Sequence, residues 1–157
     1  MINLILPNHI EQKLKIELQD AGEREIGGIL MGEHVEKGTF RICDFTIQRD
    51  GGTWITFVRR IQKSLKQALR QFFEKNKHNY TKFNYLGEWH SHPSFELIPS
   101  IQDRQSMSDI VNNPEVGANF VVLLLVKLNH EKIDYNVTLY IPGSSMIKGN
   151  LIREESD

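Results

Sequence analysis

The stretch FVVLLLVKL, residues 120–128, decides the fold class because every residue in it except one lysine is apolar. It has the length of a strand and is far too short to span a bilayer. Continuous apolar runs of this length are typical of strands that are buried on both faces of a parallel or mixed sheet. The stretch therefore predicts a central strand with other layers of the domain packed on either side.

Further strand-like segments lie before and after this run. They are residues 25–32, 40–47, 54–58, 80–89 and 134–141. The glycines of 25–32 indicate a strand that another backbone approaches closely. Two glycines separate 40–47 from 54–58 and predict a hairpin with a longer loop. Alternation over 134–141 predicts a strand near a sheet edge.

Three amphipathic segments predict helices: residues 8–21, 59–77 and 100–111. Asn8 with Glu11 three residues later resembles a capping box, and Gly22 follows the end of the first helix. The order of elements indicates a single α/β domain, residues 1–157, with a mixed, partly antiparallel sheet flanked by helices. We expect the polar residues 145–157 to form a loose tail.

Composition excludes several classes of protein. A formal net charge of −1 gives no reason to expect nucleic-acid binding. No apolar run is long enough to cross a membrane, and the first residues lack the basic lead of a signal peptide, so the cytoplasm is the expected compartment. The single cysteine, Cys43, excludes an internal disulfide.

The segment WHSHPSFELIPSIQD, residues 89–103, carries the residues with metal-binding chemistry. His90 and His92 are two apart, so on an extended backbone both imidazoles project from one face and can converge on one ion. Asp103 can supply the third ligand, since an eleven-residue gap lets the chain fold back and Ser100 suits a helix N-cap. Three protein ligands leave a fourth position for water, as hydrolytic metal sites require.

His90-x-His92, seven residues, then Ser100-x-x-Asp103 resembles the JAMM motif of the MPN-domain metalloproteases at every position. That family's upstream glutamate before a glycine-bearing strand is similar to Glu25 here. The resemblance extends over nearly the whole chain and implies an MPN/cytidine-deaminase-like sandwich. It also implies one zinc ion per chain, held by His90, His92 and Asp103.

The resemblance implies further roles for two residues. Glu25 would be the general base, and Ser100 would donate a hydrogen bond to the oxyanion of the tetrahedral intermediate. Spacing alone favours Glu88 as the base, because it shares a strand face with the histidines. Ser100 has the alternative role of a helix cap, and the two roles can coexist.

The expected reaction is hydrolysis of the isopeptide or peptide bond after the C-terminal tail of a ubiquitin-like protein, as in metal-competent family members. The chain resembles compact prokaryotic members that deconjugate such proteins in antiviral systems, which implies activating and conjugating enzymes as partners. Trimming of a sulfur-carrier protein is the alternative. A non-catalytic MPN scaffold is the alternative from another class of protein.

Overall fold

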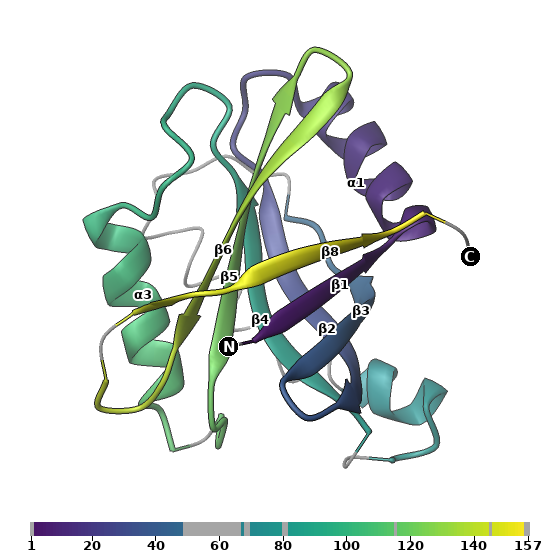
Figure 1. The fold of residues 1–157 in the computed structure, drawn as a ribbon, viewed down its shortest axis with the longest axis vertical. Helices are drawn as coiled ribbons and strands as arrows, with labels where there is room; N and C mark the ends of the chain where they lie inside the picture. The colour runs from purple at the N-terminus through teal and green to yellow at the C-terminus, as the bar shows by residue number, and fades with distance from the viewer. Residues whose placement is uncertain are drawn as a thin grey trace.

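The computed structural model describes residues 2–48, 67, 70–79, 82–114, 116–144 and 146–155, in which one mixed sheet forms the centre of the fold (Figure 1). Its strands are β1 (Asn3–Pro7), β2 (Gly27–Glu36), β3 (Thr39–Phe45), β4 (Phe83–Ser91), β5 (Val121–Asn129), β6 (Lys132–Tyr140), β7 (Ile147–Lys148) and β8 (Asn150–Glu154). They lie in the order β7-β6-β5-β4-β2-β3-β1-β8. The pairs β4–β5, β1–β3 and β1–β8 are parallel, and the others are antiparallel. The predicted mixed α/β class is confirmed.

Strand β5 is the predicted central strand, lying between β4 and β6. Val122 and Leu124 are fully buried in the core shared with helix α1 (Asn8–Ala21). Leu123 and Leu125 are fully buried in the core shared with helix α3 (Ile101–Val111). Side chains alternate between the two faces of a strand, so the helices cover opposite faces of the sheet, as Figure 1 shows.

The glycines of β2 allow close backbone contact, as predicted. A Cβ on Gly28 would lie 1.9 Å from the Thr46 carbonyl oxygen, so only glycine fits there. Thr46 also forms hydrogen bonds with Ile29 of β2 and Trp89 of β4. Its Oγ1 accepts from the Ile29 backbone N–H at 2.9 Å, and its carbonyl accepts from the Trp89 indole at 2.9 Å. The Thr46 carbonyl, a backbone group, thus links β2 and β4 next to the histidine pair.

Other predicted elements are only partly covered. Two predicted elements lie wholly or mostly outside the described residues: the hairpin partner, residues 54–58, and the helix over 59–77. Within the second range, residues 70–75 are described and are helical. Strand β3 pairs with β2 and β1. Within the described ranges, no helix has the length and apolar character needed to cross a bilayer.

Helix α1 has the predicted bounds, but the predicted capping box is wrong. Pro7 occupies the N-cap position, and no side chain caps it there. Asn8 accepts a hydrogen bond from the Gln12 side chain, 3.4 Å away. Glu11 points instead to Arg153, whose Nη2 and Nε lie 2.7 and 3.0 Å from its two carboxylate oxygens. A distant ion pair thus replaces the local cap.

The expectation of a loose tail is also wrong. Residues Asn150–Glu154 form β8, which pairs in parallel with β1, and the two strands run side by side in Figure 1. The Glu11 carboxylate binds Arg153 of β8 and also accepts a hydrogen bond from Tyr135 Oη at 2.6 Å. Backbone pairing and this buried carboxylate stabilise a segment whose polar composition had suggested a tail.

The Glu11 carboxylate predicts a pH dependence of stability. Burial raises the pKa of Glu11, but hydrogen bonds from Arg153 and Tyr135 outweigh it, so its pKa lies below the usual 4.5. Such a carboxyl stabilises the fold above its unfolded-state pKa and loses that contribution as pH falls through its folded pKa. At pH 7, Glu11→Gln should be about 1 kcal/mol less stable in urea unfolding.

Below pH 4.5 the wild type should lose stability and approach the Glu11→Gln variant. Asp20→Asn, an exposed substitution on the same helix, should retain the acid-dependent loss. An equal acid-dependent loss in Glu11→Gln would contradict the assignment.

Candidate metal centre and active site

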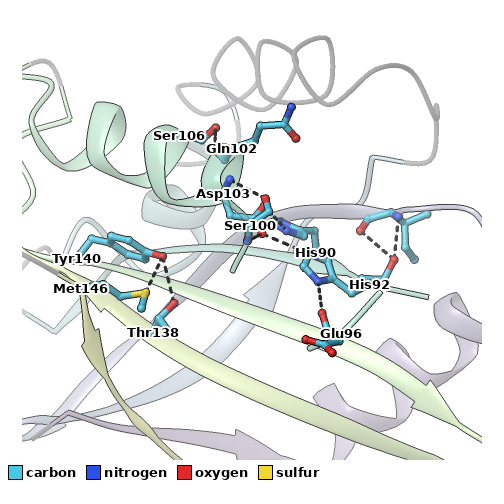
Figure 2. Close-up of polar contacts among 12 residues, drawn as sticks. His90, His92, Glu96, Ser100, Gln102, Asp103, Ser106, Thr138, Tyr140 and Met146 are labelled. Atoms are coloured by element: carbon cyan, nitrogen blue, oxygen red, sulfur yellow. Dashed lines mark hydrogen bonds and ion pairs between the residues drawn. The ribbon is translucent and has the colours of Figure 1, made fainter. Parts of the chain in front are cut away.

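The two histidines come from the end of β4. His90 lies within the strand, between Gly27 of β2 and Leu125 of β5. His92 follows the strand, and its backbone N–H donates to the Val126 carbonyl at 2.9 Å. Both side chains are buried, and their ring centroids are 5.1 Å apart. The prediction that they project from the same face is confirmed (Figure 2).

Asp103 completes a cluster of three metal-binding side chains. It lies in the first turn of α3, where Oδ1 is 3.0 Å from His90 Nε2 and Oδ2 is 3.4 Å from His92 Nε2. The three ligand atoms all lie within 4.8 Å of one another. Ligands about 2.1 Å from a tetrahedral ion stand roughly 3.4 Å apart, so the donor set fits a zinc-sized cation.

A capping box places Asp103 in the cluster. Ser100 Oγ accepts the Asp103 backbone N–H at 3.1 Å, and the Ser100 N–H donates to Asp103 Oδ2 at 2.7 Å. The Ser100 hydroxyl accepts in this bond, so its proton is still available to another acceptor. The cap role of Ser100 is confirmed, and its predicted role as an oxyanion donor is compatible with it.

The loop after β4 orients the His92 ring, which the sequence pattern did not predict. His92 Nδ1 lies 3.0 Å from the Glu96 carbonyl oxygen. A carbonyl can only accept, so Nδ1 carries the proton, and Nε2 is left either to bind an ion or, when it is protonated, to donate to Asp103. Lys127 Nζ holds the same loop by donating to the Phe95 carbonyl at 3.0 Å, and the Phe95 ring packs edge-on against His92.

The charges of the cluster suit a cation. Burial raises the pKa of Asp103, but hydrogen bonds from His90 and His92 outweigh it and hold the pKa far below its usual range. Burial lowers the pKa of His92, but its hydrogen bonds to Asp103 and to the Glu96 carbonyl outweigh burial, so the pKa lies above its usual value. Asp103 is therefore a carboxylate at neutral pH, and a metal ion that bound here would compete with a proton for His92.

Position relative to the cavity separates the two candidate bases. Glu25 lies just before β2 and lines a cavity of about 380 Å³ together with His92, Ser100 and Asp103. Glu88 does not line this cavity, and only 3% of it is exposed. Burial raises the pKa of Glu88 to about 8. Of the two glutamates, only Glu25 therefore lines the cavity beside His92 and Asp103.

Comparison with known proteins identifies the class of fold and then the family. The solution structure of a Desulfitobacterium hafniense protein matches with a TM-score of 0.64 over 97% of this chain and 93% of that one, at 16% identity, so the two share a fold. Residues 7–139 match the prokaryotic homologs of the JAB domain. The chain belongs to this family, and the resemblance seen in the motif is confirmed at that level.

A curated relative of similar sequence has a named activity. The CD-NTase/cGAS isopeptidase of Enterobacter hormaechei subsp. hoffmannii (strain UCI 50) is 28% identical over 128 residues, which cover 80% of this chain and 68% of the relative. Together with the JAB family and the cluster of His90, His92 and Asp103, this relative supports a hydrolase.

Proposed function

We propose that the chain is a zinc-dependent isopeptidase or peptidase that cuts the bond after the C-terminal tail of a ubiquitin-like protein. The observation that carries the proposal is the cluster of His90, His92 and Asp103, of which His92 and Asp103 line the same cavity as Glu25. His90 Nε2, His92 Nε2 and the Asp103 carboxylate would hold the ion. When bound, zinc supplies Lewis-acid chemistry, because it lowers the pKa of water and polarises a carbonyl.

The protein's own residues would carry the proton and stabilise charge. The Glu25 carboxylate takes a proton from the attacking water as the water oxygen bonds to the scissile carbonyl carbon. The Ser100 hydroxyl, whose oxygen already accepts from Asp103, donates its proton in a hydrogen bond to the developing oxyanion. Glu25 then gives the proton to the amine nitrogen as the carbon–nitrogen bond breaks.

The substrate class rests on the relative and on the cavity. The name of the Enterobacter relative favours a conjugate over a sulfur-carrier precursor. The cavity is lined by Phe95, Ile98 and Pro99 as well as by the polar residues, so its wall has apolar surface for a polypeptide. We therefore propose a deconjugating role in a bacterial antiviral system, in the cytoplasm, with activating and conjugating enzymes as partners.

Removal of the metal tests the proposal. Purified protein should carry about one zinc per chain, since three ligands plus water complete a catalytic site. Cleavage of a ubiquitin-like protein joined through its tail to a lysine side chain should fall to background after chelation and return with stoichiometric zinc.

Two comparisons separate the alternatives. A sulfur-carrier precursor with a short peptide extension, tested beside the isopeptide-linked conjugate, distinguishes the two substrate classes by kcat/KM. Protein that binds zinc and cleaves neither substrate would instead support the non-catalytic scaffold.

A further inference from the structure

Ser91, the residue between the two histidines, binds the backbone next to Glu25. Its Oγ accepts the Ile26 N–H at 3.0 Å and lies 3.4 Å from the Ile26 carbonyl, to which the hydroxyl can donate. Its backbone N–H also donates to the Ile26 carbonyl, at 2.8 Å. Ser91 is 2% exposed, so all of these bonds are shielded from water. The metal-binding strand is thus linked to the segment that carries Glu25.

The side chain of Ser91 changes the last rung of the β2–β4 ladder. Gly27 stands opposite His90, so Ile26 and Ser91 form the next antiparallel pair. A regular rung would join the Ile26 N–H to the Ser91 carbonyl. Here the Ile26 N–H donates to the Ser91 hydroxyl instead of to the carbonyl. Strand β2 therefore begins one residue later, at Gly27. Regular pairing between β2 and β4 therefore stops at Ile26, the residue that follows Glu25 in the sequence.

Packing holds the other side of Ile26. Its side chain is 1% exposed and belongs to the core beneath α1. Side chains alternate along β4, so the Ser91 hydroxyl faces away from the side that carries His90 and His92 and has no place in metal binding. Ser91 holds the backbone of Ile26 and the core holds its side chain. Because Glu25 is bonded directly to Ile26, these contacts restrict the position of the Glu25 backbone.

We propose that Ser91 is a positioning residue that sets the Glu25 carboxylate relative to the metal ligands. The inference rests on the proposed function, in which Glu25 moves the proton. A displacement of about 1 Å in a reacting group can lower a rate by about 100-fold. The Ser91 hydroxyl controls such a displacement because it binds the backbone of Ile26, the residue between Glu25 and the first residue of β2.

The test compares Ser91→Ala with two variants that keep more of the side chain. Ser91→Ala should lower kcat by about 10- to 100-fold with KM and zinc affinity unchanged. Ser91→Thr retains the hydroxyl and should recover most of the activity. Ser91→Cys keeps the volume but is a weak acceptor, so it should behave like alanine and serves if the alanine variant does not fold.

A matched control removes the same kind of bond elsewhere on β2. Thr46→Val deletes the side-chain acceptor of the Ile29 N–H, three residues from Ile26, and should leave kcat unchanged. In a Glu25→Gln background, Ser91→Ala should cause no further loss, because its effect acts through Glu25. A full additional loss there would show action through the ligands or the fold and would overturn the proposal.

Hydrogen exchange tests the link without activity. In the apo protein the Ile26 amide should exchange about 10-fold faster in Ser91→Ala than in wild type, whereas Thr46→Val should leave it unchanged. Wild type that cleaves no conjugate overturns the proposed function and this inference together. Wild type that cleaves, with Ser91→Ala equally active, overturns the role of Ser91 alone.

Discussion

Glu25→Gln should lower kcat by about 10²- to 10⁴-fold while the chain keeps its zinc, because general-base catalysis contributes a factor of this size. Glu25 lines the cavity beside the metal cluster but is not one of the three clustered ligands. Glutamine preserves the size of the side chain and cannot accept a proton from water. Single-turnover cleavage of the isopeptide-linked conjugate, with zinc content measured on the same samples, separates loss of the base from loss of the metal.

Two matched variants test the specificity of that result. Glu23→Gln removes an exposed carboxylate two residues away and should cleave like wild type. Glu88→Gln removes the buried alternative base, which lies outside the cavity lining, and should retain cleavage. If Glu25→Gln cleaves normally and Glu88→Gln does not, the base has been assigned to the wrong residue.

Asp103→Asn should weaken zinc binding by more than about 100-fold, since even residues that only support a ligand contribute 10- to 100-fold. The substitution removes the one anionic donor of the cluster. An asparagine oxygen can still accept the Ser100 N–H, so the first turn of α3 should persist. Competition with a chromophoric chelator measures the affinity, and circular dichroism checks the helix.

Asp109→Asn, an exposed substitution on the same helix, should bind zinc like wild type. His92→Ala should lose zinc as Asp103→Asn does. Full zinc occupancy in either ligand variant would mean that the site has been misread.

Local patterns were sufficient to predict the elements around the site. The apolar run at β5, the bounds of α1, the Ser100 cap of α3 and the histidine pair all depend on residues near one another in sequence. Such features follow from periodicity and capping preferences. The ligand cluster was predictable because its spacing matches a known motif.

Features that depend on distant partners were missed. β1 and β8 are short, and each is stabilised by pairing with the other, from opposite ends of the chain. Glu11 looked like a local cap because its bond to Arg153 is not visible in local sequence. Glu88 has the right spacing for a base, but its burial depends on strands that pack on both sides of β4. The hydroxyl of Ser91 was missed for the same reason, since its partner is Ile26.

The loop after His92 is held in place through its backbone, so its side chains can change without disturbing the His92 ring. It is held by Lys127 and by the His92 ring, and both bonds end on backbone carbonyls, those of Phe95 and Glu96. Any amino acid supplies such a carbonyl, so the side chains at 96 and 98 can be exchanged without removing either bond. If the proposed function holds, evolution or design can change which polypeptide the cavity accepts while the three ligand side chains stay in place, and a library at these two positions is a direct route to new cleavage preferences.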